Sequence, residues 1–270
     1  MEKLSEALPP KVQMECQRCK APFQALTHPK ALARYLRVPT LCPKCREDEV
    51  QSLAQREEKQ YQREVALAKE TWVTSVVPRH FLGKVFETFL QARQQVAFDA
   101  ALQYAQSFPL ESALIRDHRS LVFWSRSPGV GKTHLVCAIV QHLLDRWPSS
   151  SSCPVEFWEA GKLATSVEAA RRFSSGEDRE LFFRRRASIP LLVLDDVGKE
   201  GVNREMQEVY YRVVNDRYTM GRPMVVTANA DPYVSPLLGD ILGEASWSRL
   251  QEMCHGAVYN MTGEDYRQDF

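Results

Sequence analysis

The chain has 270 residues, of which 44% are hydrophobic, so general disorder is excluded and there is room for one large domain or a medium and a small one. Thirty-five basic against 34 acidic residues leave a net charge of +1, so any surface that binds nucleic acid must be local. No apolar run approaches the ~20 residues of a membrane span, and the N-terminus lacks the apolar core of a signal peptide. We therefore expect a cytoplasmic protein whose cysteines are thiols or metal ligands.

Two C-x₂-C pairs dominate residues 1–50, which we expect to form a zinc-binding domain. Cys16 and Cys19 make one pair, and Cys42 and Cys45 make the other. Each pair places two sulfurs on one side of a tight turn, so two pairs complete a tetrahedral Zn²⁺ site. A redox pair or free thiols are the alternatives. The other cysteines lack partners at ligand spacing and are expected to be thiols: Cys137, Cys153 and Cys254.

The rest of the chain changes from a polar helix to an alternation of strands and helices. Residues 51–70 contain no glycine or proline and mix both charge signs, which predicts a helical linker over 51–78. Residues 79–270 carry short strand candidates separated by segments of helical periodicity, and these candidates lie at 121–124, 155–158, 191–194, 224–227 and 258–261. This alternation predicts an α/β domain with a parallel five-stranded sheet between helices.

A glycine-rich segment follows the first of these strands and precedes a helix. Glycines allow backbone N–H groups to surround phosphate oxygens, and the helix adds its positive N-terminus. Lys132 would reach the β- and γ-phosphates of ATP, and the Thr133 hydroxyl would bind Mg²⁺. The predicted nucleotide-binding residues are Ser127, Pro128, Gly129, Val130, Gly131, Lys132, Thr133 and His134.

The same segment departs from the usual phosphate-binding pattern at one position. The pattern G-x-x-x-x-G-K-[ST] has glycine where this chain has Arg126. If the position requires a positive φ, arginine is strained there. A loop that binds nucleotide without hydrolysing it, and a chance glycine-rich turn, are the alternatives to an active phosphate loop.

Acidic, amide and arginine side chains follow the later strands. Asp195 and Asp196 end the third strand, where Asp195 would hold Mg²⁺ and Asp196 would polarise the attacking water. Asn229, after the fourth strand, would contact the γ-phosphate or that water. Arg249 and Arg267 are candidates for stabilising the transition-state charge. Asp and Asn are also common in turns, and single arginines are usually solvated.

Several stretches together resemble the DnaC/DnaI helicase loaders and IstB transposition ATPases, a group of AAA+ proteins. They are VFETF (85–89), SPGVGKTHL (127–135), LLVLDDVGKE (191–200), VVNDRY (213–218), VVTAN (225–229), SRL (248–250) and GEDYR (263–267). The resemblance implies that Asn229 senses the γ-phosphate, that Arg249 is an arginine finger for a neighbouring subunit, and that Arg267 is a second sensor. It therefore implies a ring or spiral oligomer. Asp196 also fits this group, in which the second acid is Asp rather than Glu.

The segment 171–186 carries six arginines interleaved with phenylalanines. Arginine beside aromatic rings suits single-stranded DNA, through phosphate neutralisation and base stacking. An amphipathic helix with buried Phe and a solvated charged face is the alternative. The candidate DNA-binding residues are Arg171, Arg172, Arg184, Arg185 and Arg186.

From these motifs and the resemblance we expect an ATPase that loads a replicative DNA helicase. The resemblance implies that the zinc domain contacts the helicase and that the ATPase oligomer binds ATP, Mg²⁺ and single-stranded DNA, with slow hydrolysis coupled to assembly. One alternative is a transposition regulator of the IstB type, which binds duplex DNA and activates a transposase. Another is a nucleotide-bound adaptor that does not hydrolyse ATP.

Overall fold

The computed structural model describes residues 11–26, 39–148, 151–163, 165–166, 176–198, 204–234 and 237–266. Arg171, Arg172 and Arg267 lie outside these residues. The chain divides into two compact units, Met1–Ala66 and Leu67–Phe270, and helix α1 (Pro43–Val76) passes from one to the other. Within the described ranges, no helix has the length and apolarity needed to cross a membrane.

The first unit contains a β-hairpin that the sequence did not lead us to expect. Strands β1 (Lys11–Glu15) and β2 (Pro22–Leu26) pair antiparallel. The turn between them carries Lys20 with φ 61°, and the Lys20 N–H donates to the carbonyl of Cys16 at 2.9 Å. The small core of this unit comprises three buried cysteines with Phe23 and Leu41 against them. So few apolar side chains give little stability, and a metal would supply the rest.

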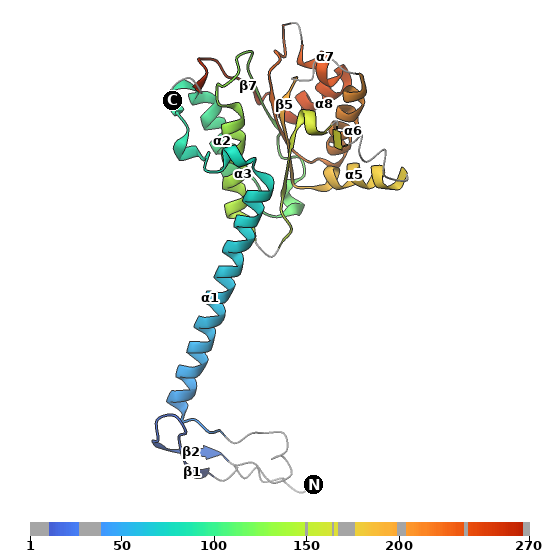
Figure 1. The fold of residues 1–270 in the computed structure, drawn as a ribbon. Coiled ribbons are helices and arrows are strands. Elements are labelled where there is room, and N and C mark those ends of the chain that lie inside the picture. Colours follow the sequence, from blue (N-terminus) through green and yellow to red (C-terminus); the bar gives the residue numbers. More distant parts are fainter. Residues whose placement is uncertain are drawn as a thin grey trace. The chain divides into compact units, whose positions relative to one another are not determined.

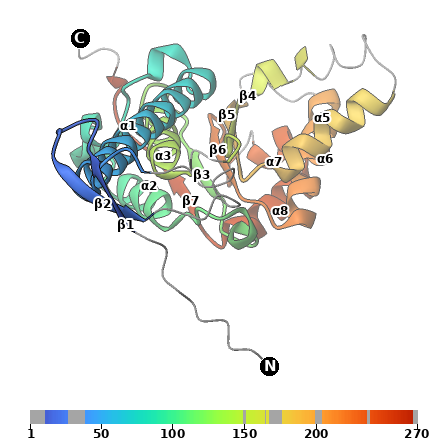
Figure 2. The ribbon, with the colours of Figure 1, turned by 90° about the horizontal axis from the view of Figure 1, so that it is seen from below.

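The second unit is built on a five-stranded parallel sheet with the strand order β4-β5-β6-β3-β7. The five strands predicted from the sequence are confirmed, and they are β3 (Leu121–Trp124), β4 (Val155–Glu159), β5 (Leu191–Val197), β6 (Met224–Ala228) and β7 (Val258–Asn260). Figures 1 and 2 both show α2 and α3 on one face of the sheet and α5 to α8 on the other. Both faces are therefore covered, which explains why β3, β5 and β6 are apolar along nearly their whole length.

One helix of this unit precedes the sheet, and the others lie between its strands. They are α2 (Gln95–Ser107), α3 (Lys132–Arg146), α5 (Gly176–Ser188), α6 (Arg204–Met220), α7 (Leu238–Leu242) and α8 (Glu244–Cys254). Short 3₁₀ turns lie at Arg79–Phe81, Phe86–Thr88, Gln91–Arg93 and Ser112–Ile115.

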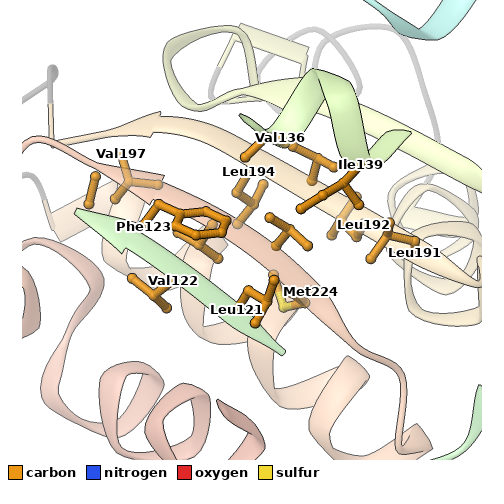
Figure 3. Close-up of a cluster of buried hydrophobic side chains, with 14 of the residues drawn as sticks. Leu121, Val122, Phe123, Val136, Ile139, Leu191, Leu192, Leu194, Val197 and Met224 are labelled. Carbon is orange, nitrogen blue, oxygen red and sulfur yellow. The ribbon is translucent and has the colours of Figure 1, made fainter. Parts of the chain in front are cut away.

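The hydrophobic core lies between the central strands and α3. Val136 and Ile139 are buried on one side of α3 and lie against the side chains of Leu192 and Leu194 from β5 (Figure 3). Phe123 of β3 is also fully buried. This packing fixes the carboxyl ends of β3, β5 and β6 beside one another, and the loops that leave these ends carry the candidate site.

A buried arginine in α6 connects the end of α5 to the turns that precede β5 and β6. Arg217 is completely buried, and burial lowers its pKa to about 9. Its guanidinium donates to carbonyls at the end of α5 and in the turns that enter β5 and β6. These acceptors are Arg186 at 2.5 Å, Ile189 at 3.0 Å, Pro190 at 3.2 Å and Pro223 at 2.5 Å. Arg217 thus satisfies four backbone acceptors, of which those of Arg186 and Pro223 are in buried contacts.

Replacing Arg217 with methionine is expected to destabilise the second unit strongly. Losing a buried charged group that makes several hydrogen bonds costs about 3–5 kcal/mol, which lowers the melting temperature of a domain of this size by about 10 °C. Arg212→Met on the same helix is the matched control, because Arg212 pairs with Glu180 and Asp216 at a partly exposed site. Such pairs contribute about 0–1 kcal/mol. If calorimetry shows that Arg217→Met and Arg212→Met lower the melting temperature equally, the buried hydrogen bonds of Arg217 do not stabilise the unit more than an exposed ion pair does.

Candidate functional site

The phosphate-binding loop connects β3 to α3 in the conformation that its glycines predict. Gly129 has φ 71° and Gly131, at the start of α3, has φ 95°. A Cβ at Gly131 would lie 2.8 Å from the ring of Phe89, and one at Gly129 would overlap the carboxylate of Asp265. Neither position therefore accepts a larger side chain. The Lys132 side chain is buried and its Nζ donates to the carbonyl of Ser127 at 3.3 Å, so it reaches back across the loop.

Thr133 and Asp195 meet at the base of this loop, as their predicted roles require. Thr133 Oγ1 donates to Asp195 and lies 3.0 Å from its Oδ1 and 3.2 Å from its Oδ2. Thr227 Oγ1, from β6, donates to the same carboxylate at 2.6 Å. Burial raises the pKa of Asp195 to about 6, although the hydrogen bonds from the two threonine hydroxyls act in the opposite direction and lower it. Hydroxyl and carboxylate oxygens are the donors that Mg²⁺ prefers, and a bound cation would keep the carboxylate ionised.

Asp196 and Asn229 also come together, from the ends of β5 and β6. The Asn229 side-chain amide donates to Asp196 Oδ1, and the Asp196 N–H donates to Thr227 Oγ1 at 2.8 Å. Asp196 has φ 63°, which places it in the left-handed region where few non-glycine residues occur. The contact joins the predicted water-polarising acid to the predicted γ-phosphate sensor.

One threonine of the site was given no role from the sequence. Thr227 contacts both predicted acids, but a threonine in an apolar strand gives no signal of that role. The 85–89 segment packs on the first turn of α3, where His134 Nε2 donates to the carbonyl of Val85 at 3.0 Å and its ring lies 5.0 Å from that of Phe89. These contacts link the nucleotide loop to the segment that follows α1.

Arg126 does not distort the phosphate loop. In the described part of the chain, a positive φ at non-glycine positions occurs at Lys20, Asp117, Asp196 and His255, and Arg126 does not have one. The position therefore does not require glycine in this chain. The strain that the sequence pattern suggested is absent, because the loop begins in a conformation open to any L-residue.

The predicted arginine finger lies on α8, next to two tyrosines of α6. Arg249 Nη1 donates to the carbonyl of Ala245 at 3.1 Å. Its guanidinium carbon lies 5.3 Å from the ring centroid of Tyr211 and 6.0 Å from that of Tyr218. Its described contacts therefore belong to α6 and α8, and none is with the phosphate loop.

The arginines at the end of α5 differ sharply in exposure. Arg184 and Arg185 are exposed, as a nucleic-acid surface requires. Arg186 is buried, pairs with Glu156 at 2.7 Å, and lies over the rings of Phe182 at 3.4 Å and Trp158 at 4.5 Å. The expectation that Arg186 faces DNA is therefore corrected, because its guanidinium is buried and neutralised by Glu156.

The four cysteines of the first unit form one cluster. Their sulfur atoms all lie within 4.8 Å of one another, and Cys19 Sγ is 3.7 Å from Cys42 Sγ. Zn–S bonds of about 2.3 Å place the sulfurs of a Zn(Cys)₄ tetrahedron about 3.8 Å apart. Backbone N–H groups of Cys19 and Cys42 lower the pKa of Cys16 to about 6, whereas burial raises that of Cys45 to about 12. The donor set and its spacing fit Zn²⁺, which would allow all four thiols to ionise.

Comparisons with solved structures identify the fold of the second unit. A crystal structure of the DnaC helicase loader is similar with a TM-score of 0.55 and 21% identity, and the match covers 68% of this chain and 100% of that one. The structure of DnaI gives a TM-score of 0.50 and 20% identity over 70% of this chain and 93% of that one. The predicted AAA+ fold, a parallel five-stranded sheet between helices, is therefore confirmed.

Comparisons of sequence place the chain in a family. The chromosomal replication initiator protein DnaA of Zymomonas mobilis subsp. mobilis is 26% identical over 170 residues, which are 62% of this chain and 32% of that protein. The insertion sequence IS21 putative ATP-binding protein of Pseudomonas aeruginosa is 27% identical over 169 residues. That match covers 58% of this chain and 59% of the relative, so the chain spans less than two thirds of either protein. The family model for the IstB-like ATP binding protein matches residues 100–269, which is more than half of the chain. This chain belongs to the family of IstB-like ATP binding proteins.

Proposed function

We propose that this chain is an ATP-dependent loader of a replicative DNA helicase, which works as an oligomer with ATP, Mg²⁺ and single-stranded DNA. One observation carries the ATPase part of the proposal. The loop that carries Lys132 and Thr133 lies beside Asp195, and Asp196 lies beside Asn229, although these residues come from three separate strand ends. The similarity of fold to a helicase loader supports the remainder.

Each residue has a defined task in this proposal. Bound ATP–Mg²⁺ would supply the reactive γ-phosphoryl group and the charge of the metal. Lys132 would hold the β- and γ-phosphates, and Thr133 with Asp195 would hold the metal. Asp196 would accept a hydrogen bond from the attacking water, and Asn229 would fix the position of Asp196. Arg249 would act on a nucleotide bound by a neighbouring subunit, and Arg267 would act as a second sensor in its own subunit.

The first unit is the proposed contact with the helicase, held in shape by Zn²⁺ on its four cysteines. Binding to purified helicase tests this proposal. The full chain with zinc and a non-hydrolysable ATP analogue is expected to form a stable complex with the replicative helicase encoded by the same genome. A transposase from that genome serves as the comparison.

A transposition regulator is the second candidate. The match to the IstB-like family and the 27% identity to the IS21 protein favour it. A stable complex with the transposase on duplex DNA, and none with the helicase, would replace the loader proposal with this one.

Single-stranded DNA is proposed to contact Arg184 and Arg185. Replacing both with alanine is expected to weaken binding and to reduce the slope of log K against log salt by about 1.4, because each phosphate contact on a single strand contributes about 0.7. Arg204→Ala, at an exposed arginine of α6, is the matched control. Fluorescence anisotropy with an oligonucleotide over a range of salt gives both slopes. An unchanged slope in the double variant would remove these arginines from the proposed interface.

A further inference from the structure

Arg126 forms an ion pair at the edge of the candidate site. Its Nη2 lies 3.1 Å from Asp231 Oδ2. Arg126 is the first residue of the phosphate-loop pattern, and Asp231 follows the predicted sensor Asn229 by two residues. The pair therefore joins the loop leaving β3 to the loop leaving β6.

This pair lies where the loops that leave β3 and β6 start next to each other. Strands β3 and β6 are neighbours in the sheet, and the Ser125 N–H donates to the carbonyl of Ala228 at 3.1 Å, so the two loops leave the sheet side by side. The γ-phosphate is expected between Lys132 and Asn229, which these two loops carry. The Arg126 guanidinium already spans the same two loops.

The two partners of this ion pair differ in exposure, and the exposed arginine can move away from the buried aspartate. The Arg126 side chain is 57% exposed, whereas that of Asp231 is 10% exposed. Asp231 Oδ1 also accepts the N–H groups of Tyr233 at 2.7 Å and Val234 at 3.1 Å. Its carboxylate therefore keeps hydrogen-bond donors if Arg126 moves away. Because the guanidinium is exposed to solvent, it can turn away from Asp231 and pair with a more highly charged anion.

We propose that Arg126 is an additional phosphate-binding residue, which exchanges Asp231 for the terminal phosphate of ATP and so favours ATP over ADP. A phosphate carries more negative charge than a carboxylate and accepts two parallel N–H bonds from a guanidinium. The proposal rests on the proposed function, because it assumes that nucleotide binds this loop. It assigns to Arg126 a role in recognising the nucleotide, in place of the defect that the sequence pattern suggested.

Affinities for a non-hydrolysable ATP analogue and for ADP test this assignment. Arg126→Gln is expected to weaken binding of the ATP analogue about tenfold and to leave ADP binding within about twofold, because ADP has no γ-phosphate. Arg126→Lys, which keeps the charge without the paired donors, is expected to recover part of the loss. Asp231→Asn frees the arginine, so affinity for the ATP analogue is expected to be equal to or higher than that of the wild type.

A purely structural role predicts a different pattern. If the pair only anchors the loop after β6, Arg126→Gln and Asp231→Asn will change both nucleotide affinities alike, and the ratio of ATP to ADP affinity will stay constant. That result would overturn the assignment of Arg126 and leave the ATPase proposal intact. A wild-type chain that bound neither nucleotide would overturn both.

Discussion

Replacing Lys132 with alanine is expected to abolish nucleotide binding and to lower ATP turnover at least about a hundredfold. The Lys132 side chain is buried and crosses the phosphate loop to the carbonyl of Ser127. Its removal leaves the phosphates without their central cation, which the backbone N–H groups cannot replace. Steady-state phosphate release, measured with single-stranded DNA present, and binding of a fluorescent ATP analogue give both quantities.

Two further variants make this result interpretable. Asp196→Asn removes the charge that is proposed to polarise water but keeps an oxygen for the Asn229 amide, so nucleotide binding is expected to persist while turnover falls. Lys162→Ala, at an exposed lysine of the same unit, should change neither nucleotide binding nor ATP turnover. If the wild type binds ATP but shows no turnover above Asp196→Asn, the chain is a nucleotide-bound adaptor. If turnover persists in Lys132→Ala, the active site lies elsewhere.

Removing the metal is expected to unfold the first unit and leave the second intact. Among the residues described, the apolar side chains that add to the cysteines in this unit are the partly buried Phe23 and Leu41 and the buried Ala25, so folding must draw on metal binding. Structural Zn²⁺ contributes about 10–16 kcal/mol in small zinc domains, far more than this core provides. Cys42→Ser, or a strong chelator, should therefore release one Zn²⁺ per chain and eliminate slow amide exchange in the β1–β2 hairpin. Metal analysis and hydrogen exchange measure the two effects.

A cysteine outside the cluster provides the control. Cys153 is partly buried in the second unit, so Cys153→Ser should change neither metal content nor exchange in the hairpin. ATP-analogue affinity should stay near the wild-type value in both variants. If the purified chain contains no zinc and its Cys42→Ser variant keeps the protected hairpin, the redox-pair or free-thiol interpretation is correct.

The sequence predicted the sheet well because its strands are buried on both faces. Runs such as those at 121–124 and 191–194 are apolar without interruption, and helical segments lie between the runs. The acids and the amide that meet at the carboxyl edge could be identified for the same reason, since Asp195, Asp196 and Asn229 lie at the ends of such runs. The contacts between Thr133 and Asp195, and between Asp196 and Asn229, are direct consequences of this topology.

Other features depend on contacts between distant segments that no local pattern encodes. The hairpin β1–β2 was missed because each strand has five residues, which gives the alternation of Val12 and Met14 with polar residues little length in which to show. The Arg186 side chain forms an ion pair with Glu156 of β4. One arginine of the run that the sequence assigned to a DNA-binding surface is therefore buried inside the fold. Arg126 was misjudged because its partner Asp231 lies 105 positions further along the chain, and the pattern alone gives no information about the backbone angles of the loop.

The backbone at Asp196 restricts which acid can stand there. A left-handed conformation is tolerated best by glycine, asparagine and aspartate, whose short side chains bond locally, whereas longer side chains are strained by about 1 kcal/mol or more. Glutamate at this position would meet that strain and would also extend its carboxylate by one methylene beyond the Asn229 amide. The conformation of this one residue therefore sets how far the proposed water-polarising carboxylate can reach, and backbone geometry limits the choice of acid at position 196 before acidity is considered.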